Sequence, residues 1–274
     1  MNDWETRIRR YASEAVNGQV VHWPAAPWLS DYVLGYSGFD VTLAQPIPRR
    51  LLPFGGVSVL VDLVPPVRRA LGTGIPAAFR FPVAGMHDCP IVFSQSGHHF
   101  GVGIGLTPAG AYALFGTPMH ELRNVVAELG DLIGPRADQL AERLAQARGW
   151  PARFGLLDEL LPTWIKAGPA QREDVAHAWR RLRQSAGCIT VAELADDVGR
   201  SGRYLEMRFR DQIGLSPKTA ARVLRFQRAL RIATASGCPA WSEVAARCGY
   251  VDQAHLNRDF RRFAGCSPTE LLAV

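Results

Sequence analysis

One pattern is written twice in the last third of the chain, and it constrains the fold of that region more than any other feature. The first copy occupies residues 193–217 and the second 243–268. Each begins with Glu, an apolar residue, Ala, two variable residues, a second apolar residue and Gly, and each ends with Gly-x-Ser-Pro. The Ala allows close approach of another helix, and the first Gly can adopt positive φ and end its helix. Each copy therefore predicts two helices joined by a short turn.

The second helix of each copy has two different faces. Ser201 and Asp252 are the expected N-caps. The apolar faces are Leu205, Phe209 and Ile213 in the first copy, and Leu256, Phe260 and Phe263 in the second. The opposite faces carry Arg203, Met207 and Arg210 with Glu206 at the flank, and Ala254, Arg258 and Arg261 with His255 and Asn257 flanking. Such faces predict a helix-turn-helix that can reach base edges or phosphates, and a solvated face is the alternative for either copy alone.

The segment between the copies, residues 216–236, predicts a helix that begins at Ser216-Pro217. About 20 helical residues span roughly 30 Å, close to the 34 Å turn of B-DNA. A rod of this length can hold two recognition helices in successive major grooves on one side of a duplex. Its arginines recur every third residue: Arg222, Arg225, Arg228 and Arg231. These arginines are interpreted either as solvent-exposed or as phosphate contacts.

The positive charge is concentrated in the same region. Residues 171–274 contain 17 Lys+Arg against 11 Asp+Glu, whereas residues 1–170 contain 14 of each. The net charge of +6 therefore belongs to the last third of the chain and favours a nucleic-acid partner. No run of 18 apolar residues and no signal-peptide core occurs, and five cysteines are spaced irregularly. We therefore expect no membrane partner and a reducing, cytoplasmic location.

Residues 1–106 predict mostly short strands separated by Gly and Pro. The strands are expected at 57–64, 78–83, 91–95 and 100–106, and residues 46–56 are interpreted as a turn-rich approach to a strand. Helical signals begin at Thr107-Pro108 and continue at 136–148 and 152–165.

These patterns predict an α+β protein with two domains. A β-rich domain with trailing helices is expected at 1–166, a linker at 167–172, where apolar content is low, and an all-α domain of two helix-turn-helix motifs at 173–274.

Two blocks and the Arg-rich helix between them carry a family resemblance. The blocks are ELADDVGRSGRYLEMRFRDQIGLSPK and EVAARCGYVDQAHLNRDFRRFAGCSPTELL. They resemble the DNA-binding domain of AraC/XylS-type transcription regulators over about 172–274. The resemblance implies a sequence-specific regulator that is not an enzyme, with double-stranded DNA and RNA polymerase as partners. It also implies the residues that face the two grooves: Arg203, Glu206 and Met207 in the first, and Gln253, Ala254, His255 and Arg258 in the second. Gln253 enters from the resemblance alone.

The N-terminal part resembles, more loosely, the companion domain of one subgroup of these regulators. The stretch that carries the resemblance is GVGIGLTPAGAYALFGTPMHELRNVV. It implies a sensor for a small-molecule effector, a dimerisation domain, or both. The apolar faces of the helices at 136–148 and 152–165 exceed the obvious need of one small domain. They predict either a homodimer interface or packing within the chain.

A second class of function depends on "MHDCPIVFSQSGHHF", which contains His87, Cys89, His98 and His99. These spacings match no zinc signature, so polar loop and strand-edge residues are favoured and no metal or cofactor is expected. Cys89 supports an alternative, a DNA-repair or thiol-transfer enzyme that a DNA-binding domain directs to DNA. Its sequence neighbours offer only His87 as an activating base.

Overall fold

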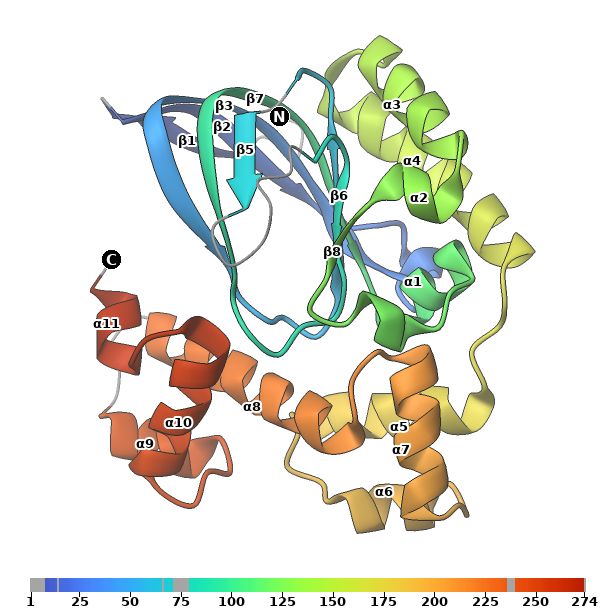
Figure 1. Ribbon diagram of the computed structural model, residues 1–274, viewed down its shortest axis with the longest axis vertical. Helices are drawn as coiled ribbons and strands as arrows, with labels where there is room; N and C mark the ends of the chain where they lie inside the picture. Colours follow the sequence, from blue (N-terminus) through green and yellow to red (C-terminus); the bar gives the residue numbers. More distant parts are fainter. Residues whose placement is uncertain (1–7, 14, 66, 71–78, 236–239, 274) are drawn as a thin grey trace.

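The computed structural model describes residues 8–13, 15–65, 67–70, 79–235 and 240–273. A curved β-sheet with helices along one side forms the N-terminal region, and the C-terminal region is entirely helical (Figure 1). The predicted α+β class is confirmed. Helix α4 (Gly149–Ala167) ends the N-terminal region, and α5 (Glu173–Gln184) begins the helical one.

Within the described residues, eight strands form one sheet, and the pairs within it are antiparallel. They are β1 (Ile8–Ala12), β2 (Val16–Trp23), β3 (Val33–Leu51), β4 (Val57–Asp62), β5 (Val67–Ala70), β6 (Pro82–Ala84), β7 (Ile91–Leu106) and β8 (Val126–Glu128). The order is β1-β2-β3-β7-β4-β6-β8, with β5 also paired to β7.

Two strands are longer than the sequence predicts. The expected strands at 91–95 and 100–106 are one continuous strand, β7, because the residues between them also pair with β3. The interpretation of residues 46–56 as turns is wrong for residues 46–51, which belong to β3. Strand β2 pairs with β3 only as far as Leu43, so Pro46 and Pro48 interrupt no ladder on that side. A register shift between Leu43 and Ile47 also accommodates Pro46, whereas Pro48 lies beyond it and is paired with Ser94 of β7. The strand expected at 78–83 is shorter, since β6 begins at Pro82.

Alternation along the central strands separates the two faces of the sheet. On β4 and β7 one face is buried and apolar: Val57, Val59, Val61, Val102, Ile104 and Leu106. Successive residues of a strand point to opposite faces, so Ser58, Leu60, Gly103 and Gly105 lie on the other. The first face packs against the helical layer, where Phe154 of α4 stacks on Trp23 and Tyr36 with ring centroids 5.8 Å apart.

The helical layer consists of α1 (Pro108–Phe115), α2 (Leu129–Ile133), α3 (Arg136–Gln146) and α4, with a short 3-10 helix, η3 (Met119–Leu122), after α1. Their apolar side chains Leu140, Leu144, Leu157 and Leu161 are buried within the chain itself. The sequence left two explanations for the apolar faces of these helices, a homodimer interface and packing within the chain. Packing within the chain accounts for the four leucines.

The C-terminal region contains α5, α6 (Val191–Asp197), α7 (Gly202–Gln212), α8 (Pro217–Thr234), α9 (Trp241–Arg247), α10 (Gln253–Ala264) and α11 (Pro268–Leu272). The predicted N-caps are confirmed: Ser201 accepts a hydrogen bond from the Tyr204 N–H, and Asp252 accepts one from the His255 N–H. Helices α6–α7 and α9–α10 are the two helix-turn-helix units, one at each end of α8 (Figure 1). No helix within the described residues has the length and apolar content needed to cross a bilayer.

Candidate nucleic-acid interface

The two second helices, α7 and α10, turn their apolar faces inward as the periodicity predicts. Leu205, Phe209, Leu256, Phe260 and Phe263 are fully buried. The opposite faces lie at the surface. The exposed residues on them are Arg203, Glu206, Met207, Arg210, Gln253, Ala254, Arg258 and Arg261, while His255 and Asn257 are half-buried at the flanks. Contact of these ten residues with DNA stays a prediction.

The outward face of α7 contains an ion pair that the helical wheel did not anticipate. The Arg210 guanidinium donates to a Glu206 carboxylate oxygen at 2.8 Å, one turn apart on the helix. Met207 between them is 52% exposed, which is unusual for a large apolar side chain. Glu206 neutralises the charge of Arg210. Arg203 therefore carries the uncompensated positive charge of this face. Met207 is placed to touch an apolar group such as a thymine methyl.

The outward face of α10 is more basic. Arg258 and Arg261 are exposed, and the N-terminal end of the helix also exposes Gln253 and Ala254. The His255 ring packs edge-on against Tyr250, with ring centroids 5.2 Å apart. That contact holds the imidazole at the flank of the helix, beside the exposed face.

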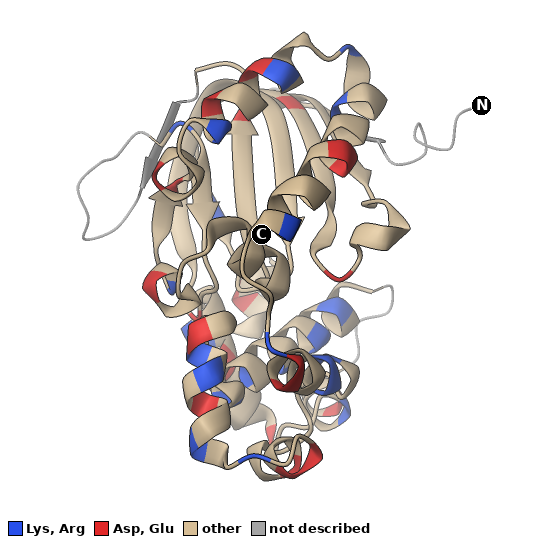
Figure 2. Ribbon diagram, turned by 90° about the vertical axis from the view of Figure 1, so that its right-hand side faces the viewer, with Lys and Arg blue, Asp and Glu red and all other residues tan. Residues whose placement is uncertain are grey.

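A groove of about 840 Å³ borders α7. Arg203, Glu206, Met207 and Arg210 form one part of its lining, and His120 and Arg123 of the N-terminal region lie among the remaining residues. The first recognition helix therefore faces open space beside the N-terminal region. In Figure 2 the ribbon segments coloured blue for Lys and Arg are densest on the helical region at the bottom of the molecule, as their distribution in the sequence predicts.

Two arginines of α8 have structural partners. Arg222 donates to the Asp259 carboxylate of α10 through Nε at 3.1 Å and Nη2 at 2.6 Å. Arg225 donates to the Gly187 carbonyl oxygen, which precedes α6, at 3.1 Å. These contacts join α8 to both helix-turn-helix units. From the sequence these arginines were interpreted only as solvent-exposed or as phosphate contacts. The signal that could have indicated a structural partner is Asp259, an acidic residue next to Phe260 on the apolar side of α10.

The four residues His87, Cys89, His98 and His99, which the sequence analysis interpreted as polar loop and strand-edge residues, have separate environments. His87 Nδ1 lies 2.9 Å from the Gly85 carbonyl oxygen, and His98 Nε2 lies 2.9 Å from Asp40. No group of three or more His, Cys, Asp or Glu gathers as metal ligands within the described residues. Burial raises the pKa of the Cys89 thiol, and the neighbouring Asp88 carboxylate raises it further. At neutral pH this thiol is therefore less ionised than an ordinary one, which opposes a nucleophilic role.

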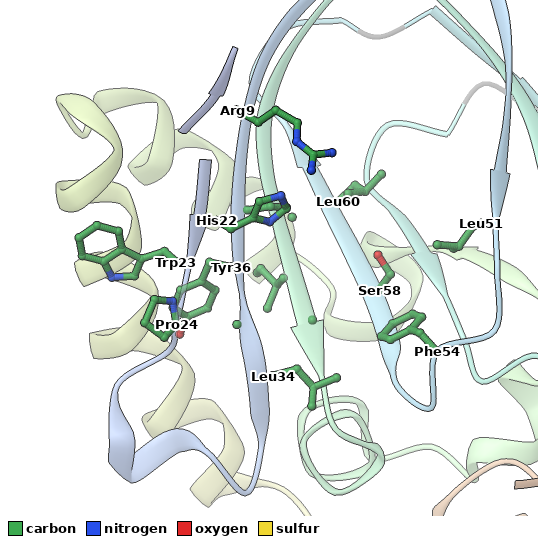
Figure 3. Close-up of a pocket in the computed structure, with 15 residues that line it drawn as sticks. Arg9, His22, Trp23, Pro24, Leu34, Tyr36, Leu51, Phe54, Ser58 and Leu60 are labelled. Carbon is green, nitrogen blue, oxygen red and sulfur yellow. The ribbon is translucent and has the colours of Figure 1, made fainter. Parts of the chain in front are cut away.

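A second candidate site lies on the open face of the sheet. It is a cavity of about 1000 Å³ whose lining includes Arg9, His22, Ser58, Leu60 and Phe54. Figure 3 shows Arg9, His22 and Leu60 pointing into this space, whereas Trp23 and Tyr36 point away from it toward the helices. Gly103 and Gly105 of β7 lie along its wall, and because they lack side chains they leave it open. The alternation Gly-Val-Gly-Ile-Gly-Leu at 101–106 is the sequence signal for this cavity.

The C-terminal part of the chain matches a family described as "Helix-turn-helix domain" over residues 194–273. Residues 21–128 match a "Domain of unknown function (DUF6597)". The "Probable thc operon regulatory protein" of Rhodococcus erythropolis is 31% identical over 86 residues, which are 30% of this chain and 25% of that protein. The match thus spans a quarter of that relative's length.

Two solved structures are also similar. ToxT from Vibrio cholerae O395 is 8% identical with a TM-score of 0.48, covering 95% of this chain and 98% of that one. A DNA-binding transcriptional dual regulator from Escherichia coli K-12 is 23% identical with a TM-score of 0.33, covering 39% of this chain and 95% of that one.

Paired helix-turn-helix units with exposed basic faces, together with the family match, define a DNA-binding protein of the double helix-turn-helix class. Within that class the helical region is similar to the AraC-type transcriptional regulators.

Proposed function

We propose that the chain is a sequence-specific transcription regulator that places α7 and α10 in two successive major grooves. The observation that carries this proposal is the repetition of one unit at both ends of α8, whose 18 residues span about 27 Å. That length approaches the 34 Å turn of B-DNA, so both helices can meet one side of a duplex. Genome-wide mapping of bound sites tests the proposal. Enriched sites should contain two conserved segments about one helical turn apart, and the absence of enrichment would overturn it.

A small-molecule effector bound in the cavity is the second part of the proposal. The end of β3 and the loop after it support this part, because Leu51 and Phe54 line the cavity while the loop also contacts α8. There the Gln227 side-chain amide donates to the Pro53 carbonyl oxygen, and Leu224 lies against Gly55. A ligand that shifts this loop therefore acts directly on the helix that joins the two DNA-binding units. Arg9 and His22 beside Leu60 and Phe54 suit a ligand with an apolar body and an anionic group.

Filling the cavity should weaken ligand binding there. Ser58 points into the space, so Ser58→Phe should weaken binding of the amphipathic anion 8-anilinonaphthalene-1-sulfonate by about tenfold or more, that is, about 1.4 kcal/mol. Thr42→Phe, at an exposed position of β3 outside the cavity lining, should leave that binding unchanged. Titrations followed by fluorescence measure both variants. Equal binding by Ser58→Phe and the parent protein would place the anion elsewhere.

We also infer a homodimer, and RNA polymerase as a further partner if the regulator activates transcription. Support for the dimer now comes from the segment around the short helix η2 (Pro27–Leu29), where Trp28 is 72% exposed and Tyr32 lies nearby in the chain. Large exposed aromatic side chains are typical of protein interfaces. Sedimentation of the full chain should give twice the 30.0 kDa monomer mass, and Trp28→Ser should shift it toward the monomer. A monomeric parent protein would contradict the inference.

A further inference from the structure

The N-terminal region contacts the second recognition helix through a buried carboxylate. Asp88 lies in the connection between β6 and β7, and Arg262 lies on α10, next to Arg261. The Arg262 guanidinium donates to Asp88 Oδ2 at 2.7 Å across the boundary between the two regions. Helix α10 ends close by at Ala264, and a methyl group on its C-cap residue Gly265 would lie 3.5 Å from Pro90 Cγ.

Independently of Arg262, residues of the N-terminal region also hold Asp88 in place. Only 2% of its side chain is exposed, and Arg123 donates to the same Oδ2 at 3.1 Å. The Asn124 amide donates to Oδ1 at 2.8 Å, and the Asp88 N–H donates back to Asn124 at 2.9 Å. Burial alone would raise the pKa of Asp88, but the hydrogen bonds from Arg262 and Asn124 and the charge of Arg123 outweigh it and hold the pKa below its usual range. The carboxylate is therefore ionised at neutral pH and fixed in direction.

Arg262 lies on the edge of the face that α10 presents outward. At 100° per residue, its direction is about 40° from that of Arg258, turned toward the buried Phe263, from which it lies about 100° away. Its side chain is 48% exposed even with Asp88 bound to it. A guanidinium at this edge, one turn beyond Arg258, has the position of a side chain that meets the phosphate backbone beside a major groove.

Carboxylate and phosphate oxygens are alternative partners for one guanidinium, because both accept its charge-assisted hydrogen bonds. We propose that Arg262 contacts a DNA phosphate only when it is released from Asp88, and that Asp88 withholds it in this conformation. Docking of α10 on the N-terminal region and full engagement of the DNA backbone then compete for the same side chain. The proposal rests on the proposed DNA-binding function and adds a restraint to it.

The test is the salt dependence of DNA binding by the full chain. Each phosphate contact contributes about −0.9 to the slope of log affinity against log salt. Asp88→Asn frees Arg262, so it should tighten binding at low salt and steepen the slope by about one. Arg262→Gln alone should leave the slope unchanged, and the double variant should return to the parent slope. The probe is a scrambled duplex that spans two major grooves, since this term does not depend on sequence.

Asp138→Asn is the matched control. Asp138 pairs with Arg80 at 2.7 Å within the N-terminal region, so its replacement changes net charge equally without touching α10. Asp138→Asn should leave the salt slope unchanged. If it changed the slope as much as Asp88→Asn does, the change in net charge alone would explain both variants, and the proposal would be overturned. An unchanged slope in folded Asp88→Asn, or a shallower slope in Arg262→Gln alone, would also overturn it.

Thermal melting first establishes that Asp88→Asn is folded. If it is not, Asp88→Ser, which also removes the carboxylate but keeps a hydroxyl as a hydrogen-bond partner for Asn124, takes its place with the same expected steepening and the same overturning outcomes. Absence of salt-dependent binding by the parent chain would instead contradict the proposed function itself, so the two failures are distinguishable.

Discussion

Replacing Arg222 by Ala should destabilise the helical region by about 3–5 kcal/mol, although arginines on helix surfaces are usually dispensable. The reason is Asp259, which is only 1% exposed and accepts two hydrogen bonds from the Arg222 guanidinium. Removal of the guanidinium leaves a buried carboxylate without its cation, and such a loss costs more than the pair contributes when intact. Arg222 also lies over the Phe263 ring, 5.3 Å from its centroid, so packing is lost as well.

Urea unfolding followed by circular dichroism measures this effect. Arg231→Ala, at an exposed position of the same helix, is the matched control and should change the free energy of unfolding by less than about 0.5 kcal/mol. The double variant Arg222→Met with Asp259→Leu should recover most of the loss, since neither charge is then left unpaired. If Arg222→Ala kept full stability and lost only DNA affinity, the phosphate-contact interpretation would be correct and the structural one wrong.

The caps and recognition-helix faces of the helical region were predictable because the signals are local. Ser201, Asp252 and Ser216 each satisfy N–H groups within three residues, so the chain near each residue determines the result. Burial of Leu205 and Phe260 follows from helical periodicity in the same way.

Partners distant in the chain were not predictable. Arg222 and Asp259 are 37 residues apart, and Asp88 and Arg262 are 174 apart. Nothing in the spacing of these residues indicates that they meet, so their arginines looked like generic basic residues. The strand across Pro46 and Pro48 was missed for a related reason. Proline disfavours a strand only where a neighbouring strand needs the N–H that proline lacks. The pairing of β2 with β3 ends at Leu43, before the prolines, and the sequence does not show this.

Arg258→Ala should cost about 1–3 kcal/mol on a site recovered by genome-wide mapping and should relax preference at one or two base pairs. Arg258 is exposed near the middle of α10, opposite the buried Leu256 and Phe260, where a guanidinium can donate two hydrogen bonds to a guanine. Such a contact carries sequence information, so the loss on a scrambled duplex should be smaller.

Arg261→Ala should act differently, although it removes the same group from the same helix. Arg261 is exposed almost one turn further along α10, where the phosphate backbone is the expected target. Its replacement should weaken the mapped site and a scrambled duplex alike and make the salt slope shallower by about one. Titrations of both variants on both duplexes across a salt series separate the two roles, and each variant serves as the matched control of the other. Identical behaviour of the two variants on both duplexes would show that α10 enters the groove in another orientation, because only the assumed orientation gives one arginine a base and the other a phosphate.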